Sequence, residues 1–264
     1  MNLDKLNRLL LYIIRITMNR SIKRFLFITI LSTSAIQMNS QVLLSLVFGD
    51  KLNSESLRFG LEGGYNFSTI DGMQTNSMTS NLNLGFYFDF VVKSNRHWSF
   101  YTGTLVKSNF GVDKLRQGDL DQLGISVRPE LGDYTQVLKS FMVPALMKYV
   151  FDDGVYIESG LQLNWIYDAF VEFNSTIDDI EIRERENNKD DINWFDFGPV
   201  VGAGYQFKNS NGLAIGAKYY LGLMEVYQDI DGYKNRSIFV KVNIPIGVKK
   251  AKKRREEKAK AQNE

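Results

Sequence analysis

Apolar and polar residues alternate along eight stretches of the chain, and this pattern constrains the fold more than any other feature. In one stretch, Val155, Ile157 and Leu161 lie on one face of an extended chain, and Glu158 and Gln162 lie on the other. A period of two is typical of a β-strand with one apolar and one polar face. We therefore predict eight strands, at residues 57–68, 81–91, 97–107, 140–150, 155–168, 195–207, 212–223 and 237–248.

The two faces differ in charge and in the size of their side chains. The apolar face carries no charged residue, and of the glycines in these stretches only Gly63 lies on it. Eight strands close into a barrel whose interior is just wide enough for side chains to fill, so the glycine-rich face belongs inside. That face also carries four acids and four bases, which can neutralise one another in pairs. We predict that they form a structural charge network in the lumen: Arg58, Glu62, Asp89, Lys148, Glu158, Asp196, Lys218 and Lys241.

The apolar, aromatic-rich face must then point outward. A soluble protein rarely exposes so large an apolar patch, but lipid covers one without cost. The pattern therefore predicts an eight-stranded antiparallel up-and-down transmembrane β-barrel over residues 57–248. The alternative is a soluble β-sandwich or a lipocalin-like barrel, which gives no reason for a charged, glycine-rich interior.

The gaps between the predicted strands alternate between long and short. The long gaps are 69–80, 108–139, 169–194 and 224–236, and the short ones are 92–96, 151–154 and 208–211. Outer-membrane barrels have short periplasmic turns and long external loops, and an even strand number leaves both termini on the periplasmic side. We therefore expect an outer-membrane location with both termini in the periplasm.

The N-terminal segment has the order of an export signal. Residues 1–40 include a basic group (Arg20, Lys23 and Arg24), an apolar run and then small polar residues. Met18 is an alternative start of the chain, and an attached amphipathic helix is an alternative reading of the segment. We assign 41–56 to a periplasmic lead segment, which either contacts a partner or extends the first strand, and 249–264 to a charged periplasmic tail.

Composition excludes several kinds of site. The chain has no cysteine and one histidine, His97, which we interpret as a residue at a strand boundary. Between 41 and 248 there are 18 basic and 26 acidic residues, so the barrel is acidic and nucleic acid is not an expected partner. We predict no catalytic residues, no cofactor and no metal. Seven acids in 173–193 suggest weak calcium binding, but they lack the ligand spacing of a calcium loop, which favours a solvated acidic loop.

Three segments resemble the PorT-like outer-membrane β-barrel family of Bacteroidetes. They are "FGLEGGYNFSTI" (59–70), "FMVPALMKYVF" (141–151) and "FGPVVGAGYQF" (197–207), and the resemblance covers roughly residues 41–248. It implies a monomeric eight-stranded barrel, and its named member is an accessory of the type IX secretion system. The lead segment and the basic tail depart from the family pattern.

We therefore expect a non-enzymatic outer-membrane protein with a structural or interaction role, as an accessory of type IX-like protein secretion. Its expected partners are outer-membrane lipid and a periplasmic or secretion-system protein. The alternative is a small-solute channel or a membrane-embedded enzyme with activity in the outer loops. Open aqueous pores typically need about 16 strands, which disfavours the channel.

Overall fold

The computed structural model describes residues 53–54, 56–177, 180–208, 210, 212–248, 253 and 257. The predicted export signal (1–40) and nearly all of the lead segment and the charged tail lie outside these residues. The elements are β1 (Leu57–Asp71), β2 (Thr79–Val91), β3 (Trp98–Val112), α4 (Gln117–Gln122), β4 (Asp133–Val150), β5 (Val155–Ile177), β6 (Ile180–Asn187), the 3-10 turn η1 (Lys189–Asp191), β7 (Phe195–Gln206), β8 (Ala214–Glu225) and β9 (Lys234–Pro245).

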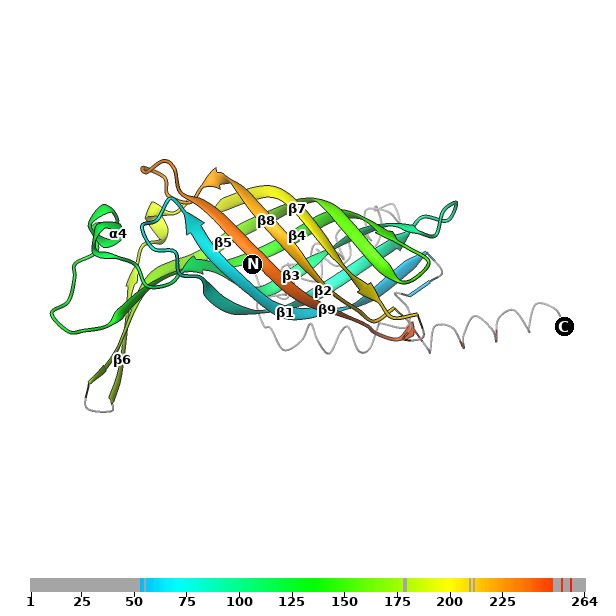
Figure 1. Cartoon of the computed structure of the whole chain (residues 1–264), viewed down its shortest axis with the longest axis horizontal. Helices are drawn as coiled ribbons and strands as arrows, with labels where there is room; N and C mark the ends of the chain where they lie inside the picture. The colour runs from blue at the N-terminus through cyan, green and yellow to red at the C-terminus, as the bar shows by residue number, and fades with distance from the viewer. Residues whose placement is uncertain are drawn as a thin grey trace, which may run out of the picture. The chain divides into compact units, whose positions relative to one another are not determined.

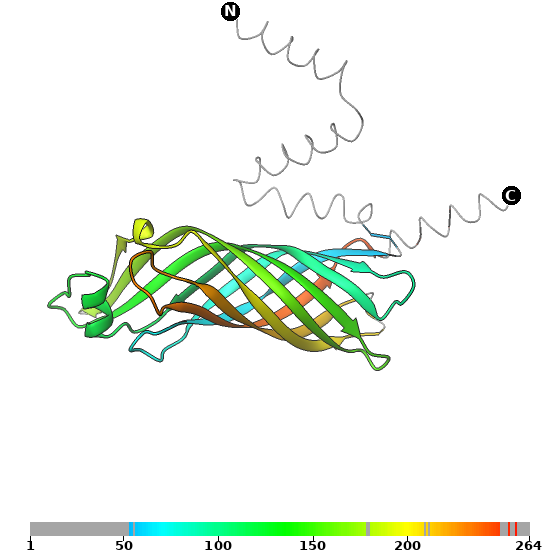
Figure 2. The ribbon, with the colours of Figure 1, turned by 90° about the horizontal axis from the view of Figure 1, so that it is seen from above.

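Eight of the strands close into an antiparallel ring. The strands are hydrogen-bonded in the order β4-β3-β2-β1-β9-β8-β7-β5, and the pairing of β4 with β5 closes the ring. Consecutive ring strands are neighbours, as in an up-and-down barrel, and Figures 1 and 2 show them tilted around a common axis. The predicted all-β, eight-stranded antiparallel fold is confirmed.

The strand β6 was not predicted. The sequence predicts a loop over 169–194, but β5 continues to Ile177 and β6 folds back along it, from Ile177↔Ile180 to Phe170↔Asn187. The prediction was wrong here because it required apolar residues on one face, and these strands carry charges on their outer side instead. The ends of β4 and β5 that lie beyond the ring form, together with β6, a three-stranded extension that we call the fin (Figure 1).

The polar face of the ring strands points inward and the apolar face points outward. Glu62 and Lys241 are 3% and 2% exposed, whereas Ile157 and Val240 are 51% and 50% exposed. Register shifts in four of the strand pairings interrupt this alternation. In β5, Ser140 pairs with Ile166 and Lys139 with Asp168, so Tyr167 is an extra residue of a β-bulge. Beyond the bulge, the odd-numbered residues of β5 face inward instead of outward.

The two ends of the barrel differ. Short connections of the ring, at 92–97, 151–154 and 207–213, lie at one end, which we call the short-turn end. The connections that contain α4, the β5–β6 hairpin and η1 lie together at the other end, the long-loop end (Figures 1 and 2). No helix among the described residues is long and apolar enough to cross a membrane.

Candidate functional site: the barrel interior and the long-loop end

Charged side chains fill the interior near the short-turn end in two layers. In the first layer, Asp89 lies between two bases: its Oδ2 atom is 3.5 Å from Arg58 Nη1 and 3.8 Å from Lys148 Nζ. Both cations also donate to Gln206 Oε1, at 3.3 and 3.4 Å. Lys148 further lies over the ring of Tyr156, 4.4 Å from its centroid. This layer joins strands β1, β2, β4, β5 and β7.

The second layer holds two ion pairs around a tyrosine. Lys241 Nζ lies 2.6 Å from Glu158 Oε1, and Lys218 Nζ lies 3.4 Å from Glu62 Oε1. The hydroxyl of Tyr101 donates to Glu62 and accepts a hydrogen bond from the Asn243 side chain at 2.6 Å. All of these side chains are buried. A charge removed from water needs a partner at this range, and each carboxylate here has one.

Glycines make room for these interior aromatic rings. Gly204 and Gly216 face each other on β7 and β8. A β-carbon at either position would collide with the hydroxyl group of Tyr156. The crowding that the glycine pattern predicts is therefore caused, at these two positions, by the side chain of Tyr156.

Asp196 stands apart from the other predicted network residues. It lies near the start of β7, in the half of the barrel toward the long loops, where its carboxylate accepts hydrogen bonds from Asn235 Nδ2 at 3.0 Å and from the Met224 amide at 3.3 Å. The ion pairs found among the described residues do not include it. The four predicted bases cluster toward the short-turn end, so the expected pairing of four acids with four bases does not extend to Asp196.

An apolar cap closes the long-loop end. Phe110, Leu138 and Val171 lie inside the ring on β3, β4 and β5 toward the long-loop end, and residues from the connections at that end pack against them. These loop residues are Met73, Leu115, Leu120, Ile125, Ile192, Val226, Tyr227 and Tyr233. We did not predict the cap, although the apolar residues within the predicted loops were a signal for it. The interior is therefore filled from the charged layers to the cap.

Polar groups fix the cap at two points. Asp119 lies in the first turn of α4. Its carboxylate accepts hydrogen bonds from the backbone amide of Gln74 at 2.7 Å and from the backbone amide of Arg116 at 2.9 Å. Gln136 and Asn188 exchange amide hydrogen bonds at 3.1 and 2.7 Å. The hydroxyl of Tyr227 also donates to Gln136, at 3.3 Å. These bonds connect the β1–β2, β3–β4, β5–β7 and β8–β9 connections to one core.

The outer face carries an aromatic group at each end of its apolar band. Near the short-turn end, Trp98 lies 4.9 Å from Tyr149 between ring centroids, and near the long-loop end Trp165 lies 4.8 Å from Trp194. From Val155 to Tyr167, a strand that rises ~3.3 Å per residue at a tilt of ~45° advances about 28 Å along the axis. This matches the ~25 Å apolar band between aromatic girdles in outer-membrane barrels.

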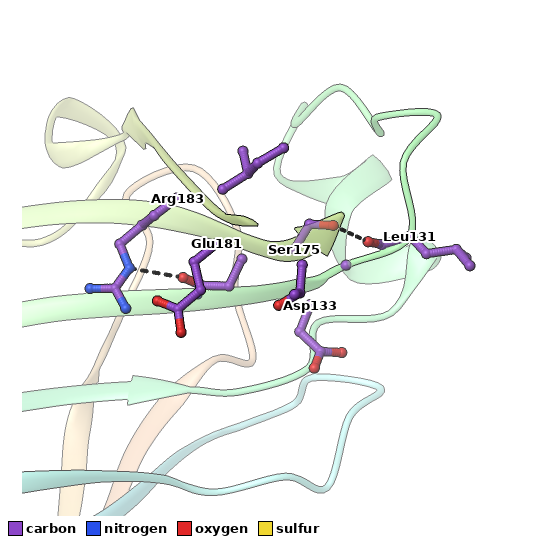
Figure 3. A pocket seen from close by; sticks show the side chains of 9 residues that line it. Leu131, Asp133, Ser175, Glu181 and Arg183 are labelled. Atoms are coloured by element: carbon purple, nitrogen blue, oxygen red, sulfur yellow. Dashed lines mark hydrogen bonds between the residues drawn. The ribbon is translucent and has the colours of Figure 1, made fainter. Parts of the chain in front are cut away.

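The fin carries an open polar pocket. Its volume is about 670 Å³, and the residues that line it include Leu131, Asp133, Ser175, Glu181 and Arg183 (Figure 3). Ser175 donates to the carbonyl of Leu131, and Arg183 Nε donates to Asn174 Oδ1 at 3.1 Å, so the walls are held by internal hydrogen bonds. Leu131 itself is 94% exposed. The pocket offers a polar contact surface.

The remaining candidate residues lie at the periphery. His97 precedes β3, with Nδ1 2.7 Å from the Val150 carbonyl oxygen and Nε2 3.8 Å from an Asp152 carboxylate oxygen. Within the part of the chain that the structure describes, no three His, Cys, Asp or Glu side chains are grouped as metal ligands. Asp178 and Asp179 of the suggested calcium loop lie outside the described residues.

One comparison with known proteins, the family model, agrees with this architecture. A family model for the outer membrane protein beta-barrel domain matches residues 40–228. Among solved structures, the chain is similar to Ail, the attachment invasion locus protein of Yersinia pestis in complex with the heparin analogue sucrose octasulfate, with 16% identity over 73% of this chain and 100% of that one and a TM-score of 0.40.

Two further solved structures are similar at low identity. Neisserial surface protein A shares 8% identity over 72% of this chain and 99% of that one, with a TM-score of 0.38. OprG from Pseudomonas aeruginosa shares 12% identity over 72% and 93%, with a TM-score of 0.32. The comparison with curated proteins gives no match.

Proposed function

The chain belongs to the outer membrane protein beta-barrel domain family, and from this premise we propose that it is a non-enzymatic structural and interaction component of the bacterial outer membrane. In this proposal the ring of strands is a rigid, filled anchor, and the long-loop end with its fin is the binding surface. Outer-membrane lipid surrounds the apolar band, and a second protein is the partner of the fin.

The filled interior is the observation that carries this proposal. Two layers of paired charges occupy the short-turn end, and the cap of Phe110, Leu138, Val171 and loop residues occupies the other. A barrel filled in this way offers a solute no open path. A strand needs ~9–11 residues to cross the membrane, and β5 is longer than this, so the fin extends beyond the membrane. β5 alone has 23 residues.

We propose that the long-loop end faces the outside of the cell and that both termini lie in the periplasm. The long β3–β4 connection and the β5–β6 hairpin lie at this end, whereas the connections at the opposite end are all short, which supports this orientation. The chain has no cysteine, so single cysteines give a clean test. In intact cells, a membrane-impermeant maleimide should label Leu131→Cys and not Asp153→Cys, and both should be labelled after the outer membrane is permeabilised. Labelling of Asp153→Cys alone in intact cells would invert the orientation.

Within this role, we propose assistance to protein secretion of the type IX kind. The resemblance of residues 59–70, 141–151 and 197–207 to the PorT-like family supports it, and the tail at 249–264 would contact a periplasmic part of the machinery through its basic residues. Deletion of the gene should leave a broad set of exported proteins in the periplasm, measured by mass spectrometry of medium and periplasm. An unchanged secretome would exclude the secretion role and leave the anchor role intact.

A further inference from the structure

The outer face of β4 and β5 changes from apolar to charged just beyond the aromatic girdle. Phe141 and Tyr167 pack with their ring centroids 4.8 Å apart on the outer side of the barrel. Two residues before Phe141 on the same face of β4 lies Lys139, and it pairs with Asp168 across the strands. The Lys139 ammonium lies 2.8 Å from the Asp168 carboxylate.

Two cations cover the ring of Phe170, three residues beyond Tyr167. Lys139 Nζ lies 5.1 Å and Arg185 Cζ lies 4.6 Å from the ring centroid. Phe170 is only 6% exposed, although it stands on the outer face of the fin. Stacking on an aromatic face holds a guanidinium group in place at small entropic cost. We call Lys139, Phe170, Arg183 and Arg185, with Asp168 and Glu172, the cation platform.

The cation platform has one more base than acid. Glu172 is shared by two arginines: its Oε2 lies 2.7 Å from Arg185 Nε, and its Oε1 lies 3.6 Å from Arg183 Nε. Within the part of the chain that the structure describes, these contacts use Nε, which leaves the terminal amino groups of both guanidinium groups for a further ligand. The side chains of Arg185 and Arg183 are 53% and 60% exposed. A guanidinium edge of this kind binds phosphate with two parallel hydrogen bonds.

The height of the platform matches the position of lipid headgroups. Three residues at ~3.3 Å each and a tilt of ~45° place Phe170 about 7 Å beyond Tyr167 along the barrel axis. The headgroup region of a bilayer adds ~5–7 Å on each side of the hydrocarbon core. Lys139 and Arg185 both reach the ring of Phe170, so their charges lie at this level and on the side that faces lipid.

We propose that the cation platform binds the phosphate groups of a lipid headgroup in the outer leaflet of the outer membrane. This inference rests on the orientation given under the proposed function, in which the fin is outside the cell. The lipid is preferred over a soluble anion because the platform faces outward from the barrel at headgroup height, above a continuous apolar band. The bound lipid would then hold the base of the fin at the surface of the membrane.

Native mass spectrometry of the purified full-length protein in detergent tests the platform with bisphosphorylated lipid A as the probe. The double variant Lys139→Gln with Arg185→Gln should bind lipid A at least tenfold more weakly than the unmodified protein. The matched control, Lys93→Gln with Lys208→Gln, removes the same charge at the short-turn end and should bind normally. Heat-dependent migration on denaturing gels checks that each variant is folded.

A gain of affinity provides a second test that does not depend on a loss. Asp168→Asn with Glu172→Gln removes the competing carboxylates and should strengthen lipid A binding several-fold. Equal binding by all variants would overturn the proposal, as would equal binding of a phosphate-free glycolipid with the same acyl chains. Occupation of the platform by inorganic phosphate without retention of lipid A would assign it to a soluble anion and overturn the lipid. Binding in detergent does not depend on orientation, so a negative result leaves the proposed function untouched.

Discussion

The ion pair of Lys241 with Glu158 shows how the interior charges depend on one another. Both side chains are at most 2% exposed, and Nζ lies 2.6 Å from Oε1. A buried pair adds little stability compared with apolar residues of the same size, but loss of one partner leaves an isolated buried charge. Each buried charge therefore needs its partner to remain stable in the interior.

Removal of one member of this pair should destabilise the barrel strongly. We expect Lys241→Met to lower the free energy of unfolding by about 3–5 kcal/mol, because Glu158 is left buried without its cation. The double variant Lys241→Met with Glu158→Leu should recover most of this loss. Urea-dependent unfolding in lipid vesicles measures both, with Lys93→Met at an exposed turn as the control. A single variant as stable as the double variant would show that the pair is not coupled.

The cap contains a tyrosine with a shifted pKa. Tyr227 lies in the β8–β9 connection, outside the strands, and burial raises the pKa of its hydroxyl group well above the usual 10.0, with a smaller contribution from Tyr233 and Asp119. The folded protein therefore keeps the proton more tightly than the unfolded chain. The stability from this group is fully present below pH 10 and falls as the pH rises above it.

We expect the long-loop end to loosen at alkaline pH while the lipid-embedded strands stay intact. Limited proteolysis of the β3–β4 and β8–β9 connections should be faster at pH 11 than at pH 8. Tyr227→Phe removes the ionisable group and the bond to Gln136, so the variant should be cut somewhat faster at pH 8 but show a smaller increase at pH 11. An increase as large in the variant as in the original chain would assign the effect to other groups.

At the scale of elements, the fin depends on the ring more than the ring depends on the fin. Among the described residues, β6 pairs only with the end of β5, and most of its side chains are exposed. The ring is closed by the pairing of β4 with β5, which continues to Val150↔Tyr156 at the short-turn end. The lipid-embedded part of the barrel is thus complete without β6.

Replacement of residues 175–186 by a flexible Gly-Ser linker of about six residues, long enough to span the offset between Asn174 and Asn187 in the strand register, should leave the ring folded. We expect the same heat-dependent migration on denaturing gels and a similar midpoint of unfolding in vesicles, because no ring pairing is lost. Binding of the partner protein proposed for the fin should disappear. Replacement of the β7–β8 turn at 208–211 by Asn-Gly is a control of the same kind at the opposite end. Failure of the shortened chain to form a barrel would mean that the fin is needed for folding.

For the whole molecule, the filled interior predicts that the barrel does not conduct ions. Barrels with open aqueous channels have about 16–18 strands, and this ring has eight. In planar bilayers the purified protein should give no stable unitary current steps, with a 16-stranded porin as the positive control. Stable steps of one size would contradict the filled interior and favour the channel that we considered from the sequence.

The sequence by itself determined the eight strands, their antiparallel ring and which face meets lipid. Alternation with a period of two is a local property, and glycines such as Gly204 and Gly216 mark the crowded side without knowledge of any neighbour. The eight predicted network residues are all on the inner face, but their distances depend on how the ring closes, so the separation of Asp196 from the bases could not be read from the chain.

Only the tertiary structure decided the cap, the fin and the cation platform. Leu120, Ile192 and Val226 pack together from connections that are far apart in sequence, and no local pattern reports such contacts. The bulge at Tyr167 reverses which residues of β5 face inward, which ends the alternation that predicts a strand. Beyond the lipid band the outer face meets water, so charged residues such as Lys139 and Arg185 replace apolar ones and the strand continues without its sequence signal.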